Sequence, residues 1–174
     1  TIVRPATVCG VSPRMRFELV ANIFARDAIT KSRITVHGGS QRRPGVHIDD
    51  LCELYVRLLT PEMTGVSRGQ VFNAGAGNQT LLELAHVVQA VVEEEFGRPV
   101  EIVTSPSDDQ RSYHVDSSKA RDVLGWSPKK TVADAVRDIC AAFRAGCFPD
   151  PEAARYVNVR VMKRRSESVA PPQT

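Results

Sequence analysis

The stretch "RITVHGGSQRRPGVHIDDLCELYVRLL", residues 33–59, contains both patterns that decide the fold class. Its first five residues alternate polar and apolar side chains and stop at two glycines, which is typical of a short strand. After two arginines and the strand-like "VHI", apolar residues recur at helical spacing, namely Leu51, Tyr55, Leu58 and Leu59. The stretch therefore predicts a strand, a sharp bend that carries the arginines, and a helix.

The bounds of this helix follow from its end signals. We expect it to begin at Asp49 or Asp50, because Asp50 and Glu53 have the spacing of a capping box. Pro61 is expected to end it, because proline cannot continue a helix.

The rest of the chain alternates in the same way, which predicts an α/β fold. A capping box at Thr80 and Glu83 marks the clearest helix start, and Gly97 marks the end of that helix. Pro5 weakens the first expected strand, because proline belongs at strand edges or bulges. The further strands are expected in residues 1–9, 70–77 and 100–106, and the further helices in residues 16–29, 80–96, 117–124 and 131–145.

Composition indicates an ordinary globular domain. The chain has 174 residues, of which 42% are hydrophobic and 25% charged, and its net charge is +3. No long basic run lies inside the expected fold, which argues against nucleic-acid binding. No apolar run approaches the roughly 18 residues of a membrane span. The cysteines have no C-x-x-C spacing, and Cys52 and Cys140 fall on apolar helix faces. They predict buried thiols in a reducing cytoplasm, not disulfides or zinc ligands.

The two ends of the chain differ in character. The opening "TIVRPATVCG" is an apolar strand with no methionine and no polar preamble, which favours a chain cut from a longer protein. The end, "KRRSESVAPPQT", is polar and contains proline. We expect a folded portion over residues 1–163 and a disordered tail over residues 164–174.

Two polar clusters suggest an anionic ligand. Arg42 and Arg43 follow the glycine bend, and a guanidinium makes paired bonds to phosphate oxygens. Asp109 and Arg111 follow the strand at residues 100–106. Arginine on a pyrophosphate with carboxylate on ribose hydroxyls suits a nucleoside diphosphate. The alternative is that both clusters are solvated loops.

The sequence gives weaker indications of dinucleotide binding, of a metal site and of catalytic residues. "NAGAGNQT", residues 73–80, carries G-x-G-x-x-T, one glycine short of the dinucleotide fingerprint, and a tight turn explains it as well. His47 and Asp49 alternate onto one face, but Asp49 is expected at the helix start, so we predict no metal site. No tyrosine precedes a lysine by four residues, and no G-x-S-x-G is present, so we predict no catalytic residue in this chain.

Several stretches together resemble one family. They are "VRPATVCGVSPRMRFELVAN" (residues 3–22), "GGSQRRPGVHIDDLCELYVRLL" (38–59), "QVFNAGAG" (70–77), "QRSYHVDSSKARDVLGWSPKKTVADAV" (110–136) and "ARYVNVRVMK" (154–163). In this order they resemble the C-terminal portion of the extended short-chain dehydrogenases, specifically the NAD-dependent epimerases and dehydratases of nucleotide sugars. The resemblance implies the C-terminal part of a Rossmann-type parallel sheet plus the small mixed α/β substrate-binding domain.

The resemblance also implies roles for individual residues. Arg43 would grip the nucleotide phosphates, Thr35 and His37 would line the base pocket, and Asp109 and Arg111 would contact ribose or phosphate. Asn22 would face the substrate, and Pro5 would lie where the chain passes the nicotinamide.

The implied function is that of the nucleotide-sugar-binding half of an NAD(P)-dependent enzyme. The family's glycine-rich loop and Tyr-x-x-x-Lys pair lie upstream of the "RPATV" strand and are absent here. We therefore expect that this chain alone does not bind NAD or NADP or turn over substrate, and that it works with a missing N-terminal cofactor half in a cytoplasmic homodimer. The alternatives are a non-catalytic binding or assembly module and one chain of a split enzyme.

Overall fold

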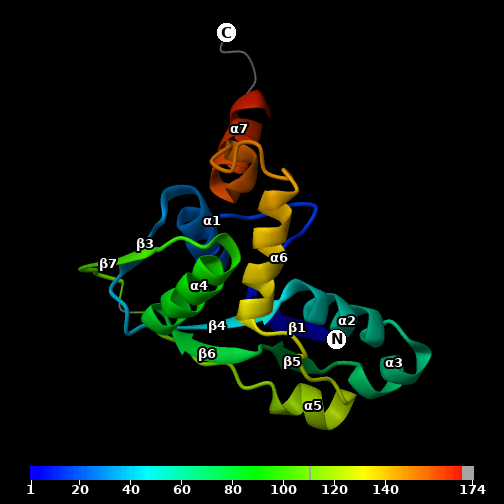
Figure 1. Cartoon of the computed structure of the whole chain (residues 1–174). Coiled ribbons are helices and arrows are strands. Elements are labelled where there is room, and N and C mark those ends of the chain that lie inside the picture. Colours follow the sequence, from blue (N-terminus) through cyan, green and yellow to red (C-terminus); the bar gives the residue numbers. More distant parts are fainter. Residues whose placement is uncertain (110, 170–174) are drawn as a thin grey trace.

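The computed structural model describes residues 1–109 and 111–169. Strands and helices alternate along the chain, as the sequence predicts (Figure 1). The strands are β1 (Ile2–Pro5), β2 (Thr7–Cys9), β3 (Arg33–His37), β4 (Arg42–His47), β5 (Val71–Ala74), β6 (Gly77–Thr80) and β7 (Glu101–Ser105). The helices are α1 (Val20–Lys31), α2 (Ile48–Leu58), α3 (Pro61–Ser67), α4 (Leu81–Phe96), α5 (Ser118–Leu124), α6 (Val132–Arg144), the 3₁₀ turn η1 (Ala154–Tyr156) and α7 (Asn158–Val169).

The described strands form three small sheets. β1 pairs with β5, β2 with β4 and β3 with β7, all in parallel, whereas β4 and β6 are antiparallel. Parallel strands joined by helices are the signature of α/β architecture, so the predicted fold class is confirmed.

Two hydrophobic clusters hold the elements together. The larger one lies among α1, α4, α6 and β3, and four aromatic rings close one end of it. The ring of Phe17 lies 5.1 Å from that of Phe148 and 5.2 Å from that of Tyr156, centroid to centroid. The smaller cluster lies under α2 and α5 and is centred on Trp126, whose indole N–H donates to the backbone carbonyl of Asp50 over 3.2 Å.

Helix ends with strong local signals are confirmed. The Thr80 hydroxyl accepts from the backbone N–H of Glu83, and the Glu83 carboxylate accepts from that of Thr80. Gly97 and Gly125 end α4 and α5 in the left-handed conformation that glycine adopts without strain.

The first expected strand is in fact two strands. The chain leaves β5 and joins β4 at Ala6, so β1 and β2 belong to different sheets. Pro5, which has no N–H to donate, stands at this change of partner. The expected helix at residues 16–29 begins later, at Val20, because Phe17 donates its backbone N–H to the carbonyl of Tyr156.

The predicted start of α2 is wrong. Its N-cap is His47, whose ring nitrogen Nδ1 accepts from the backbone N–H of Asp49 over 3.1 Å. Asp50 is buried and accepts from the backbone N–H of Lys130 instead of capping. At the other end, α2 stops at Leu58, and Pro61 is the first residue of α3, where its missing N–H costs nothing.

The expected apolar stripe of α2 is also only partly correct. Leu51 is buried and Leu58 half-buried as expected, but Tyr55 and Leu59 are exposed, and Leu54, which was not predicted, is buried. Cys52 is exposed as well. Cys9 and Cys140 are buried as predicted, whereas Cys147 is exposed, so the prediction of a buried thiol is wrong there.

Four elements have no counterpart in the sequence interpretation, namely α3, β6, η1 and α7. β6 pairs with β4, so Arg42 and Arg43 lie in a strand opposite Thr80 and Gln79 and not in a bend. Helix α7 follows η1 and ends at Val169, so its backbone includes the first six residues of the expected tail. The remainder of that tail, residues 170–174, lies outside the described residues.

Candidate functional site

One cavity collects four of the six predicted substrate-binding residues. Its volume is about 430 Å³, and its lining includes Thr35, His37, Arg43 and Asp109. These residues come from the neighbouring strands β3 and β4 and from the loop after β7, in which Asp109 lies more than 60 residues after Arg43 in the sequence. Helix α1 closes the other side, and we call this space the arginine cavity.

Strand β3 presents Thr35 and His37 to the cavity because side chains two residues apart share one face of a strand. Ile34 and Val36 point the other way and are fully buried. The ring nitrogen Nδ1 of His37 lies 2.7 Å from the Ser105 hydroxyl on β7, which fixes the ring.

Arg43 is the cation of the cavity, and the chain itself holds it in place. Its Nη1 donates to the backbone carbonyls of Arg42 (3.0 Å) and Arg111, and its Nη2 lies 3.4 Å from an Asp109 oxygen. The guanidinium carbon also lies 5.6 Å from the centre of the Tyr113 ring. The side chain is 16% exposed, so these contacts restrict its position before a ligand arrives.

Asp109 and Arg111 form a second charged pair beside Arg43. The two Asp109 oxygens accept from Nε and Nη2 of Arg111 over 2.7 and 2.8 Å. The hydrogen bonds from the Arg111 side chain, followed by its backbone N–H, hold the pKa of Asp109 well below its ordinary value. Asp109 is therefore a carboxylate at neutral pH.

Sequence interpretation missed Gln41, which organises this loop. Its amide accepts from the backbone N–H of Gly39 over 2.7 Å and donates to the carbonyl of Asp109 over 2.8 Å. The side chain of Gln41 lies against Gly38, whose φ of +81° suits glycine. The only sequence signal for this role is a single glutamine shortly after two glycines, and that pattern predicts nothing more than a loop.

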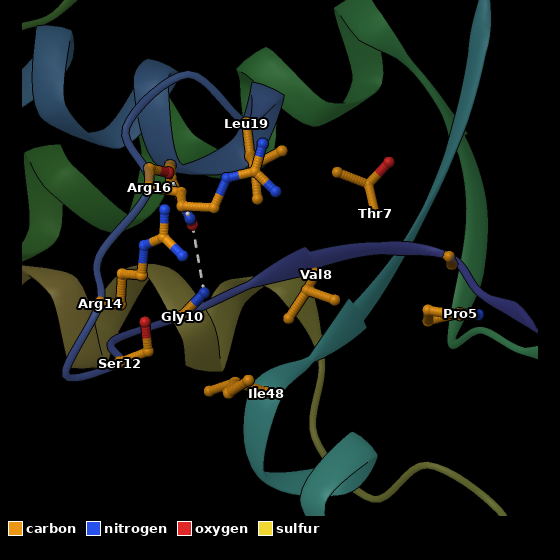
Figure 2. A pocket seen from close by; sticks show the side chains of 11 residues that line it. Pro5, Thr7, Val8, Gly10, Ser12, Arg14, Arg16, Leu19 and Ile48 are labelled. Atoms are coloured by element: carbon orange, nitrogen blue, oxygen red, sulfur yellow. Dashed lines mark hydrogen bonds between the residues drawn. The ribbon is translucent and has the colours of Figure 1, made fainter. Parts of the chain in front are cut away.

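Of the other two predicted substrate-binding residues, Arg111 lines neither cavity, and Asn22 lines a different cavity together with Pro5, the predicted cofactor-binding residue. Asn22 and Pro5 border a space of about 450 Å³ together with Arg14 and Arg16. Figure 2 shows the two arginines at one end of this cavity and Pro5 at the other. Asn22 is also a structural residue, because its oxygen accepts from the Gly10 backbone N–H and its nitrogen donates to the Arg16 carbonyl.

A third cluster joins His47, Asp49 and Asp138, whose ligand-type atoms lie within 4.8 Å of one another. The His47 nitrogen Nδ1 already accepts a backbone N–H, so Nε2 carries the proton and donates to Asp138 over 3.1 Å. The Lys130 ammonium lies 2.6 Å from Asp49 and supplies the positive charge. These hydrogen bonds and ion pairs explain why His47, Asp49 and Asp138 lie close together.

Comparison with known proteins gives consistent relatives. The chain is 33% identical over 142 residues to UDP-glucuronic acid decarboxylase 2 of Arabidopsis thaliana, a match that covers 79% of this chain and 30% of the relative. It is 30% identical over 146 residues to UDP-glucose 4-epimerase of Mycolicibacterium smegmatis, with 82% of this chain and 44% of the relative covered. The chain thus spans less than half the length of these curated relatives. No protein-family model matches it.

Solved structures show the same fold. The structure of UDP-glucuronic acid 4-epimerase from Bacillus cereus, in complex with UDP-glucuronic acid and NAD, superposes with a TM-score of 0.67 at 23% identity. The match covers 83% of this chain and 45% of that one. This likeness confirms the predicted Rossmann-type fold class. Within the described part of the chain, no helix has the length and apolarity that a membrane crossing requires.

Proposed function

We propose that this chain is the nucleotide-sugar-binding part of a larger enzyme. The chain belongs to the extended short-chain dehydrogenases, and among them to the NAD-dependent epimerases and dehydratases of nucleotide sugars. The observation that carries the proposal is the convergence of Thr35, His37, Arg43 and Asp109 on one cavity. These residues lie on separate elements, and the resemblance had assigned all of them to the nucleotide.

Each residue has a role that its contacts support. The Arg43 guanidinium is restrained by backbone carbonyls and is directed to the cavity, where it binds the diphosphate. Asp109 accepts from ribose hydroxyls, and Arg111 beside it keeps it ionised. Thr35 and His37 contact the base. Such restraint favours binding, because less side-chain freedom is lost when the ligand arrives.

The second cavity is the proposed location of the sugar. Asn22 and Pro5 border it, and α1 separates it from the arginine cavity, since this helix lends residues to both. A diphosphate held by Arg43 would orient the sugar toward Asn22, which is positioning and not chemistry.

The described residues do not fit a whole dinucleotide cofactor. The G-x-G-x-x-T stretch, residues 75–80, ends in β6, and its Thr80 hydroxyl already caps α4, so this stretch does not form a glycine-lined phosphate cradle. In the complete enzyme, NAD or NADP would supply hydride acceptance and return. Pro5 would offer the nicotinamide an apolar wall. We propose further that the complete enzyme is a cytoplasmic homodimer in which an N-terminal half holds the cofactor.

Replacing Arg43 tests the proposal. We expect Arg43→Ala to weaken UDP binding by about 1.5–3 kcal/mol, roughly 10- to 150-fold, because a charge-assisted hydrogen bond is lost. Arg42→Ala is the matched control, since the Arg42 side chain donates outside the cavity, to the carbonyl of Asn78. Calorimetry with UDP, TDP and GDP on both variants measures the difference. Equal losses, or none, would show that this stretch does not bind the nucleotide.

A further inference from the structure

The cavity bordered by Asn22 and Pro5 holds positive charge without a negative counterpart. We call this space the Asn22 cavity. Eleven of the described residues line it, and they include Arg14 and Arg16 but no aspartate or glutamate. The other lining residues are apolar or uncharged. Because walls of low polarity focus the field of charged groups, the end of the cavity that holds the arginines attracts an anionic group.

The local sequence directs both arginines to this cavity. Burial alternates along the stretch from Arg14 to Phe17, since Met15 and Phe17 are buried and belong to the larger hydrophobic cluster. The two arginines alternate with these apolar residues and line the Asn22 cavity instead (Figure 2). Two apolar side chains in the core thus fix the direction in which the charged side chains leave the loop.

Asn22 orders the backbone of the loop that carries the arginines. Its Oδ1 accepts from the backbone N–H of Gly10 over 3.1 Å, and its Nδ2 donates to the carbonyl of Arg16 over 3.0 Å. One buried side chain of α1 therefore joins the two ends of the loop between residues 10 and 16. A loop that is ordered before the ligand arrives loses less conformational entropy on binding.

The two arginines differ in how their charge is balanced. Nε and Nη2 of Arg16 both lie 2.8 Å from Oε1 of Glu18, so this guanidinium has a carboxylate partner. Arg14 instead donates from Nη2 to the amide oxygen of Asn158 over 2.8 Å, and no described carboxylate pairs with it. Because an amide carries no charge, Arg14 keeps its full positive charge and further N–H donors at the cavity.

We propose that Arg14 binds a carboxylate of the sugar, so that the substrate is a nucleotide sugar of the uronic acid class. The inference rests on the proposed function, in which the sugar occupies this cavity. A planar guanidinium matches the two oxygens of a carboxylate and forms paired hydrogen bonds with them. A carboxylate carries one negative charge, which Arg14 alone balances, because Glu18 already neutralises Arg16. The phosphates remain at Arg43 in the arginine cavity.

Two nucleotide sugars that differ in one group test the assignment. UDP-glucuronic acid has a carboxylate where UDP-glucose has a hydroxymethyl group, and the two molecules are otherwise identical. In calorimetry on the 174-residue chain, UDP-glucuronic acid should bind roughly tenfold tighter or more, because hydrogen bonds between charged groups contribute at least this much. Wild-type affinities that agree within about twofold would overturn the assignment.

Arg14→Gln separates the sugar from the phosphates. The variant should bind UDP and UDP-glucose within about twofold of the wild type, because Arg14 is exposed and its loss should leave the fold intact. It should lose the preference for UDP-glucuronic acid. Arg68→Gln is the matched control, since it removes the same charge from an exposed residue at the end of α3, outside the Asn22 cavity. The control should keep the full preference.

The outcomes separate this assignment from the proposed function. If UDP binds in an Arg43-dependent manner but the wild type does not distinguish the two sugars, only the Arg14 assignment fails. If Arg14→Gln weakens UDP as much as UDP-glucuronic acid, Arg14 binds phosphate, and the assignment is again wrong while the proposed function stands. Loss of the preference in Arg68→Gln as well would indicate general charge and would also overturn it. If no nucleotide binds the wild-type chain, both proposals fail.

Discussion

The two sides of the molecule differ in how far their large apolar side chains are exposed. On the side of the arginine cavity, the turn before α1 rests on the buried rings of Phe17, Phe148 and Tyr156. On the side of β1, α2 and α3, large apolar side chains face outward: Ile2 is 57% exposed, Val56 66% and Leu59 82%. We call this second side the open face.

The difference shows which region has its charged and apolar groups paired or packed within this chain. The charged groups of the cavity are mostly paired within the chain, and its walls are supported from beneath. On the open face, β1 pairs with β5 alone among the described strands, so its other edge presents backbone groups without strand partners. Exposed apolar side chains beside an open edge are typical of a surface that another chain or segment covers.

The largest expected effect tests this contrast by stability. Phe17→Ala should lower the free energy of unfolding by about 3–5 kcal/mol, because it empties the centre of the aromatic cluster. Leu59→Ala, on the open face, should change it by less than about 0.5 kcal/mol, because an exposed side chain loses little on truncation. Urea unfolding of both variants, followed by circular dichroism, measures the two values. Similar losses would mean that the open face is packed in solution.

Local signals in the sequence predicted much of the fold. Thr80 with Glu83 and the glycines at positions 97 and 125 define helix ends through contacts within a few residues, so sequence alone suffices for them. The strand at residues 33–37 was equally clear from its alternation. The two polar clusters already indicated Arg43 and Asp109 as candidates for an anionic ligand, and the resemblance added Thr35 and His37.

Features that depend on distant partners could not be predicted. In β6 only Thr80 favours strands, and Gly77 and Asn78 disfavour them, so the pairing with β4 decides the conformation of this segment. His47 caps α2 in place of Asp50 because Asp138, 91 residues away, holds its ring.

A second expected effect concerns association through the open face. We expect the 174-residue chain to self-associate at rising concentration, because burying a leucine side chain stabilises a contact by about 1.5–3 kcal/mol. Leu59→Lys should then weaken association roughly tenfold or more, since a charge replaces that contact. Sedimentation measures the change, and Leu82→Lys, which alters a 38% exposed leucine on α4, is the control. A strictly monomeric chain whose β1 amides are strongly protected from hydrogen exchange would contradict this account.

The smallest expected effect concerns the cavity side and its response to acid. The pKa of Asp109 is lowered in the folded chain, chiefly by the hydrogen bonds from Arg111. A carboxylate with a lowered folded pKa stabilises the fold above its unfolded pKa, and this contribution is lost as the pH falls toward the folded value. The stability difference between wild type and Asp109→Asn should thus be constant above about pH 5 and shrink below about pH 4.

Urea unfolding at several pH values measures this difference. Asp108→Asn removes the same charge one residue earlier and is the matched control, since neither the Arg43 nor the Arg111 side chain pairs with Asp108 in the described structure. The expected change is small because the Asp109–Arg111 pair is largely exposed, and water and salt screen such pairs. If both variants followed the wild type at every pH, the Asp109 pair would not order the loop beside Arg43.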